Sequence, residues 1–246
     1  LMNRYLDVAD DTPALFRVLP IFLSMRAQIR AHVGAAAVAG QADAQARQAM
    51  MDKARAYLKL AADYLTLARP LLVAVGGLSG SGKSRLAREV ASYLGQSPGA
   101  RVVRTDVKRK RLAGIHPNET LAIEGYSAEM TERTYAAFFD EAASAIRAGQ
   151  CAVLDAVFAM PDQRAQAEAL AETLGVSFTG VWVSAPEEVR VSRVIARERN
   201  VSDVTADIAR GQSDYDIGAV TWAVVDSSGS KEDTIAQGLA VLGVTR

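Results

Sequence analysis

The chain has 246 residues and half of them are hydrophobic, so it can bury a core in one α/β domain with an appendage, or in two small domains. Its 28 basic and 28 acidic residues cancel, which gives no general attraction to nucleic acid or to an anionic membrane. The single cysteine, Cys151, excludes a disulfide framework within the chain. No apolar run approaches the roughly 20 residues that span a bilayer, and no signal segment opens the chain, so we expect a cytoplasmic protein. The first residue is Leu1, which fits a fragment of a longer polypeptide.

The first 69 residues contain no strand-like run and predict two helices. Apolar residues recur at steps of three and four along the first of them, as in an amphipathic helix. They are Leu15, Val18, Leu19, Phe22, Met25, Ile29 and Val33. Gly40 interrupts this pattern, and a second helix is predicted over about 41–68. We expect the two helices to form an antiparallel hairpin that ends at Pro70 and packs on the domain that follows.

From residue 70 onward, short apolar runs alternate with helical segments. The runs that predict strands are Leu71–Val75, Arg101–Thr105, Cys151–Val157, Phe178–Val183 and Val220–Val225. Because they are almost continuously apolar, we expect strands buried on both faces, as in a parallel sheet. The helical segments are 83–94, about 127–148, about 162–174, and 185–199 with a continuation after a break at 202–212. This alternation predicts a three-layer α/β/α fold with a five-stranded parallel sheet over residues 70–246, preceded by a helical hairpin over residues 1–69.

A glycine-rich segment follows the first predicted strand. The residues Gly77-Leu78-Ser79-Gly80-Ser81-Gly82-Lys83-Ser84 match G-x-x-x-x-G-K-[ST] at every fixed position. Glycines let backbone N–H groups approach phosphate oxygens at a helix N-terminus, where the helix dipole favours negative charge. Lys83 can then reach the β- and γ-phosphates, and Ser84 can offer its hydroxyl to Mg²⁺. The segment, together with Arg85, therefore predicts an ATP and Mg²⁺ site in a P-loop NTPase fold; the alternative is a Gly/Ser-rich turn without a ligand.

Two candidate catalytic residues, Asp106 and Arg109, follow the second predicted strand. The carboxyl ends of parallel strands line the ligand crevice of such sheets. A carboxylate there can take the proton from an attacking hydroxyl, and Arg109 can hold the charge of the acceptor or of a phosphate. The pair predicts the acceptor side of a kinase. The alternative is that Thr105 or Asp106 begins a helix whose basic residues face solvent.

A second carboxylate, Asp155, ends the third predicted strand. An acidic residue at this place beside a P-loop often helps to hold the Mg²⁺ shell, as a Walker-B aspartate does. The alternative is a carboxylate that caps nearby loop amides. The sequence leaves these two roles equally open.

Arginines gather after the fourth predicted strand. Arg190, Arg193 and Arg197 are spaced by three and four residues, so they would share one helix face. Arginines that close over a γ-phosphate stabilise the charge of the group in transfer. We therefore expect Arg193 and Arg197 to act from a lid with its tip at 199–203. The alternative is an exposed helix whose arginines pair with neighbouring glutamates.

These motifs together resemble a known family. The region from Leu71 to about Ser227 is similar to the P-loop kinases related to polynucleotide 5′-hydroxyl kinase, zeta toxin and chloramphenicol phosphotransferase. The D-x-x-R step at Asp106 and Arg109 resembles the acceptor motif of the polynucleotide kinase branch, in which the aspartate is the general base and the arginine contacts the acceptor. The resemblance implies transfer of the γ-phosphoryl group of ATP to a hydroxyl.

A narrower resemblance concerns one branch, in which the kinase domain follows an aminoglycoside-phosphotransferase-like domain. It is carried by Tyr126-Ser127, Met130–Tyr135, Leu154–Phe158 and Arg164, and by Leu19–His32 in the N-terminal segment. It implies that residues 1–69 are the tail of an upstream phosphotransferase-like domain and that residues 70–246 are the kinase domain. The catalytic H-x-D and metal-binding D-x-D segments of the upstream family are not recognisable, and Val157 stands where related proteins more often carry Thr.

The sequence therefore predicts a kinase that acts on a small molecule or a nucleotide. The first alternative is a polynucleotide 5′-hydroxyl kinase, since basic residues lie near Asp106. The neutral total charge and the lack of clear aromatic platforms near that motif disfavour nucleic acid. The second alternative is an ATP-binding regulator of the upstream domain without turnover. The acceptor itself is not identified by the sequence.

Overall fold

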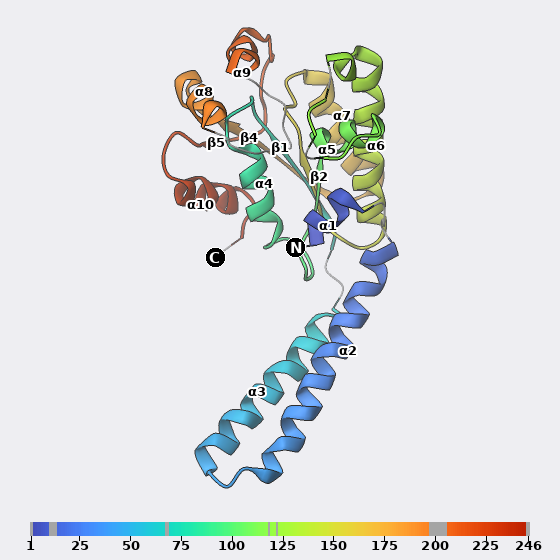
Figure 1. Cartoon of the computed structure of the whole chain (residues 1–246), viewed down its shortest axis with the longest axis vertical. Coiled ribbons are helices and arrows are strands. Elements are labelled where there is room, and N and C mark those ends of the chain that lie inside the picture. Colours follow the sequence, from blue (N-terminus) through green and yellow to red (C-terminus); the bar gives the residue numbers. More distant parts are fainter. Residues whose placement is uncertain are drawn as a thin grey trace.

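The computed structural model describes residues 2–9, 14–66, 69–117, 119–121, 123–196 and 206–244. Its α/β part is built on one parallel sheet of five strands, and a pair of long helices extends from that part (Figure 1). The α/β fold with a five-stranded parallel sheet, predicted from the alternation of apolar runs and helical segments, is confirmed.

The strands are β1 (Leu71–Gly76), β2 (Arg101–Arg104), β3 (Ala152–Asp155), β4 (Ser177–Ser184) and β5 (Ala223–Asp226). They lie in the order β2-β3-β1-β4-β5, and every neighbouring pair is parallel. In the central strand, Val75 pairs with Asp155 of β3 and with Val181 of β4. The chain first runs from β1 to one side of the sheet and later to the other. The carboxyl end of β1 is therefore the topological switch point, where open α/β sheets bind ligands.

The expected burial of the strands on both faces is found for β1, β2 and β3, whereas three of the four residues of β5 are exposed. Successive strand residues point to opposite faces, and helices cover both of them. On one face, α4 (Lys83–Ala91) and α10 (Lys231–Val241) pack over Val73 and Val75. On the other face, α6 (Ala128–Arg147) and α7 (Pro161–Leu174) pack over Leu72 and Ala74. Figure 1 shows these helices as the two outer layers around the sheet. Burying each Leu or Val side chain in this way stabilises the fold by about 1.5–3 kcal/mol. The strands at the centre of the sheet therefore have almost continuously apolar sequences.

The remaining elements lie at the carboxyl edge of the sheet. They are α5 (Thr105–Leu112), η2 (Ile123–Tyr126), α8 (Glu187–Ile195), α9 (Ala206–Gly211) and η3 (Gln212–Asp214). Helix α5 begins directly after β2, so Asp106 lies in the first turn of a helix. None of the helices within the described ranges is long and apolar enough to cross a membrane.

The N-terminal segment contains α1 (Met2–Val8), α2 (Ala14–Ala37), η1 (Val38–Gly40) and α3 (Ala44–Asp63). As predicted, α2 and α3 form an antiparallel hairpin (Figure 1). Small residues let the two helices approach: Ala27, Ala54 and Ala61 are buried, and the Ser24 hydroxyl donates to the Ala61 carbonyl at 2.9 Å.

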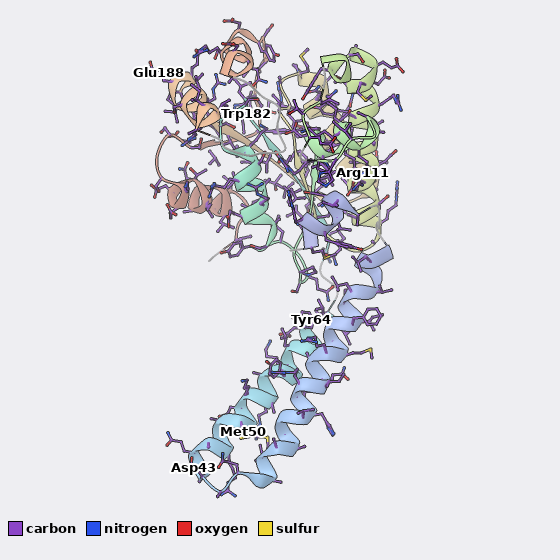
Figure 2. All side chains as sticks on the ribbon, viewed as in Figure 1. Asp43, Met50, Tyr64, Arg111, Trp182 and Glu188 are labelled. Carbon is purple, nitrogen blue, oxygen red and sulfur yellow. The ribbon has the colours of Figure 1, made fainter. Side chains whose placement is uncertain are left out.

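The expectation that this hairpin packs on the α/β part is wrong for most of its length; at its base, Gln96 donates to the Tyr64 carbonyl. Figure 2 shows Asp43 and Met50 at the far end of the hairpin and Tyr64 where it joins the rest of the molecule. The apolar stripe of α2 therefore lies open, and Phe22, Ile29 and Val33 are exposed. It is α1 that contacts the sheet, since the Asn3 side chain accepts from the backbone N–H of Val102 at 2.9 Å.

Candidate nucleotide and acceptor site

The loop between β1 and α4 has the backbone that the glycine pattern predicted. Gly77, Gly80 and Gly82 have φ angles of +143°, +87° and +94°. A Cβ atom would lie 2.4 Å from the Val183 carbonyl oxygen at Gly77, and 2.3 Å from the Arg190 carbonyl oxygen at Gly80. Gly82 differs, because a Cβ there would meet nothing within 4 Å. The open space beside Gly82, at the N-terminus of α4, fits a phosphate that approaches the backbone N–H groups.

Side chains from distant parts of the sequence hold this loop in place. The backbone N–H of Ser79 donates to Gln212 Oε1 at 2.7 Å. Arg190 donates through Nη1 to the carbonyl oxygens of Ser79, at 3.2 Å, and Ala209, at 3.1 Å. The Ser227 hydroxyl donates to the Ser81 carbonyl. No motif marks Gln212 or Ser227, and sequence reasoning missed both as supports of the loop.

The position of Arg190 corrects one expectation. A row of arginines on one helix face was predicted to include Arg190, but the Arg190 side chain is 3% exposed and lies against the loop backbone. Burial lowers the pKa of Arg190, while Glu187 raises it. Arg190 is therefore a structural tie between α8 and the phosphate loop, whereas Arg193, three residues later, lines the cavity described next.

A cavity of about 410 Å³ opens at the N-terminus of α4. Of the predicted site residues it is lined by Ser79, Gly80, Ser81, Gly82, Lys83, Ser84, Arg85, Asp106 and Arg193. Gly77 and Leu78 precede this lining and are not part of it. The lining also includes residues that sequence reasoning missed, namely Leu86, Arg88, Ala196, Ser227, Lys231, Thr234 and Ile235. The cavity thus extends from the phosphate loop toward α5 and toward α10.

Ser84 and Asp155 form the candidate metal position. The Ser84 hydroxyl donates to Asp155 Oδ1 at 3.0 Å, and Asp155 Oδ2 accepts from Arg104 Nε at 3.3 Å. Both oxygens of Asp155 thus bind side chains, which differs from a cap on loop amides. Mg²⁺ is usually held by one or two protein oxygen ligands together with substrate phosphates. Among the residues that the structure describes, no three His, Cys, Asp or Glu side chains gather as ligands. The hydroxyl–carboxylate pair therefore fits a magnesium ion that relies on phosphates for its other ligands.

Asp106 lines the cavity from the first turn of α5. The helix begins at Thr105, as the alternative interpretation held, yet Asp106 is not its cap: the N-cap position is Arg104, without a side-chain cap hydrogen bond. The helix start and the functional interpretation are therefore compatible. A carboxylate in the first turn is also stabilised by the helix dipole.

The other predicted arginines have different places. Arg109 lies outside the cavity lining; it is 8% exposed and donates through Nη1 to the Gly125 carbonyl at 3.0 Å and to Thr131 Oγ1 at 3.1 Å. Its guanidinium also lies 5.0 Å from the centre of the Tyr126 ring. Arg193 lines the cavity and donates through Nη2 to the Ser227 carbonyl at 2.6 Å. Arg197 and the expected lid tip at 199–203 lie outside the described residues.

Comparisons with known proteins agree with this architecture. A family model described as "AAA domain" matches residues 72–215, which is more than half of the chain. An uncharacterized protein of Mycobacterium tuberculosis is 31% identical over 237 residues. That match covers 93% of this chain but 44% of the relative, so the chain spans less than half of the relative's length.

Two solved structures share the fold at low sequence identity. A gluconokinase from Sinorhizobium meliloti matches with a TM-score of 0.50 and 19% identity, over 71% of this chain and 92% of its own. The APS kinase of Mycobacterium tuberculosis, solved in complex with AMPPNP and APS, matches with a TM-score of 0.51 and 19% identity, over 71% and 96% of the two chains. These similarities show a kinase-like P-loop NTPase fold.

Proposed function

Because this chain belongs to the AAA domain family, whose model matches residues 72–215, we propose that it is an ATP-dependent phosphotransferase. It moves the γ-phosphoryl group of ATP to a hydroxyl of a small molecule or a nucleotide. The observation that supports this most is that Lys83, Ser84 and Asp106 line one cavity. A phosphate loop, a metal position and a carboxylate base are the parts that phosphoryl transfer to a hydroxyl requires.

The nucleotide end of the site rests on the phosphate loop. The backbone N–H groups from Gly80 to Ser84 and the ammonium of Lys83 would bind the phosphates. Ser84 and Asp155 would hold Mg²⁺, which when bound neutralises phosphate charge during transfer. Beyond the loop the cavity continues along Ser227, Lys231 and Thr234, which leaves room for the nucleoside.

The acceptor end rests on Asp106. Its carboxylate takes the proton of the acceptor hydroxyl as that oxygen bonds to the γ-phosphorus, while the bond from the γ-phosphorus to the β–γ bridging oxygen breaks and ADP leaves. Arg193, which lines the same cavity, stabilises the charge of the group in transfer, and Arg197 is proposed to join it. Arg109 is proposed as a positioning residue, because it ties α5 to Gly125 and Thr131 beside the acceptor end.

The division of the chain is also part of the proposal. Residues 70–246 would be the kinase domain, and residues 1–69 the tail of an upstream phosphotransferase-like domain in a longer cytoplasmic protein. The greater length of the Mycobacterium tuberculosis relative supports this. So does the open apolar stripe of α2, which finds no cover on the α/β part among the described residues.

The test is a transfer assay with γ-labelled ATP and a panel of hydroxyl compounds: neutral sugars, sugar acids, sugar phosphates, nucleosides and polynucleotides with free 5′-hydroxyls. Once an acceptor is found, Asp106→Asn should lower turnover by about 10²–10⁴-fold, the usual contribution of a positioned base. It should leave ATP affinity within a few-fold, because Asp106 serves the acceptor. Asp162→Asn, an exposed aspartate in the first turn of α7 and outside the cavity, is the matched control.

Three outcomes would change the assignment. Full turnover of Asp106→Asn would remove it as the base. Transfer to polynucleotide ends alone would favour the 5′-hydroxyl kinase. Tight ATP binding with neither transfer nor slow hydrolysis would favour a regulator without turnover.

A further inference from the structure

Two arginines on the short strand β2 are buried in very different ways. Arg101 is 2% exposed and Arg104 is 5% exposed. Arg101 is well paired: Nε donates to Glu141 Oε1 at 2.7 Å, and Nη1 donates to Asp7 Oδ1 and to Asn3 Oδ1, each at 3.0 Å. Burial alone would raise the pKa of Glu141, but Arg101 and Lys108 lower it. Arg101 is thus neutralised within the fold and serves to join α1 and α6 to the sheet.

Arg104 lacks such partners. Its one hydrogen bond to a described residue runs from Nε to Asp155 Oδ2 at 3.3 Å. A guanidinium carries five N–H donors, so the other four, on Nη1 and Nη2, find no acceptor among the described residues. The remaining buried arginines, Arg109, Arg164 and Arg190, each donate to two or more groups. Neither Nη atom is among the fully buried polar atoms that lack a partner, so this end of Arg104 is open to solvent or to a ligand.

Strand geometry indicates where Arg104 points. Val102 packs in the core cluster beneath α4, and Arg104, two residues later, faces the same side of the sheet. Its partner Asp155 accepts from Ser84 of α4, which agrees with this direction. Arg88 lies one turn beyond Ser84 on that helix and lines the cavity together with Asp106. Arg88 and Arg104 thus both adjoin Ser84, one along the helix and the other through Asp155. Burial lowers the pKa of Arg88, and the positive charge of Arg104 lowers it further.

Arg88 also has free donors. It is exposed to the cavity, and no residue within the described ranges accepts a hydrogen bond from its guanidinium. Two neighbouring positive charges with unused donors repel each other unless an anion lies between them. The nearby carboxylate of Asp155 is already shared between Arg104 and Ser84. The pair therefore has the charge and the donors to receive an anionic group from outside the chain.

We propose that Arg88 and Arg104 form an anion subsite beside Asp106, and that the acceptor is a small hydroxyl compound with a carboxylate or phosphate group. The proposal rests on the proposed kinase function, since it assigns the acceptor class to the same cavity. Planar guanidiniums match both anions through paired N–H donors. An anion held there fixes the rest of the acceptor, so that its hydroxyl reaches Asp106 in an oriented position.

The size and charge of the site favour a small acid over a polynucleotide. One cavity of about 410 Å³ has to hold both the triphosphate end and the acceptor. The chain as a whole has a net charge of zero, whereas proteins that bind polynucleotides usually rely on an extended basic surface. A single pair of arginines beside the base suits one anionic group near one hydroxyl.

The experiment measures anion binding directly. The full chain is saturated with AMPPNP and Mg²⁺, so that the phosphate loop is filled, and is then titrated calorimetrically with inorganic phosphate and, in a second arm, with acetate. We expect one further binding site for at least one of these anions, and the stronger ligand indicates which acidic group the acceptor carries. Arg88→Gln should weaken that binding at least tenfold. Arg147→Gln, an exposed arginine at the end of α6, should leave it unchanged.

Arg104→Gln is the second variant and should weaken anion binding to a similar degree; its thermal unfolding is measured in parallel because Arg104 is buried. Folded AMPPNP-loaded protein that binds neither anion would overturn the subsite, as would binding that Arg88→Gln leaves unchanged. In both cases the nucleotide site of the proposed kinase is left intact, because AMPPNP is bound, and the transfer assay still decides the kinase function. If AMPPNP itself does not bind, the proposed function fails and the subsite falls with it.

Discussion

The two ends of the cavity are built in different ways. The phosphate end comes from one continuous stretch, residues 79–85, whose shape follows from glycines between a buried strand and a helix. The proposed acceptor end draws on separate elements: Arg88 of α4 and Asp106 of α5 line the cavity, and Arg104 of β2 is linked to Ser84 of the loop through Asp155 of β3. The comparison shows that local chain geometry can specify anion binding, whereas a base, a metal ligand and an acceptor pocket meet only when separate strands align.

The phosphate end is not entirely local, however. Gln212 and Arg190 reach its backbone from elements more than a hundred residues away. The loop conformation that the glycines permit is therefore also held by α8 and η3. The phosphate end therefore depends on two kinds of residue: loop residues placed to bind phosphate, and residues such as Gln212 and Arg190 that hold the loop in position.

Lys83→Ala should have the largest effect on turnover, and it tests the phosphate end of the cavity. Removing this charge should lower turnover by about 10³–10⁵-fold, the scale on which cations stabilise phosphoryl transfer. Unfolding temperature should change little, because Lys83 lines the cavity and is not part of the core. Steady-state assays and thermal unfolding measure the two quantities, with the exposed Lys53→Ala on α3 as control. Unchanged turnover would refute the phosphate-loop assignment.

Asp155→Asn should have an intermediate effect on turnover, because the proposed magnesium ion lies between the phosphate end and the acceptor end. Asparagine keeps one oxygen, which can accept from Arg104 while the amide NH₂ donates to the Ser84 hydroxyl, but it removes the charge that a magnesium ion needs. We expect the Mg²⁺ concentration for half-maximal turnover to rise about 10–100-fold, the range in which weakened metal sites fall. A magnesium titration at saturating ATP measures this, and activity should recover at high Mg²⁺. Loss of activity at every Mg²⁺ concentration would instead mean that Asp155 acts in the transfer step itself.

Gln212→Ala should give the smallest effect and test the outer support of the loop. It leaves the buried N–H of Ser79 without its acceptor, a cost of about 1–3 kcal/mol that loosens the loop. We expect the KM for ATP to rise about 3–10-fold, with kcat nearly unchanged, since 1.4 kcal/mol corresponds to a factor of ten.

The conservative variant sharpens that measurement. Gln212→Glu keeps an oxygen that can accept from Ser79 and should restore most of the ATP affinity. The exposed Gln166→Ala on α7 is the control. If Gln212→Ala and Gln212→Glu have the same KM as the unchanged chain, the contact plays no part in ATP binding.

Several elements could be predicted from the sequence because their signals are local. The buried strands were recognised from unbroken apolar runs, although β3 and β5 are shorter than predicted at Ala152–Asp155 and Ala223–Asp226. The hairpin was recognised from its helical period, but its packing was not. Periodicity says that one face of α2 is apolar without saying what covers it, and in the structure Phe22 and Val33 stay exposed.

The sequence by itself determined the phosphate loop, the class of the fold and the candidate base, since each depends on residues close together in the chain. Only the tertiary structure decided how the arginines divide. Arg101 and Arg104 are three residues apart on one strand, yet alternation sends them to opposite faces of the sheet. Arg101 meets the carboxylates of α1 and α6 and becomes structural, while Arg104 meets one carboxylate and the open cavity side of α4. The physical reason is that a buried charge takes its role from the partners around it, and strand pairing and helix packing supply those partners.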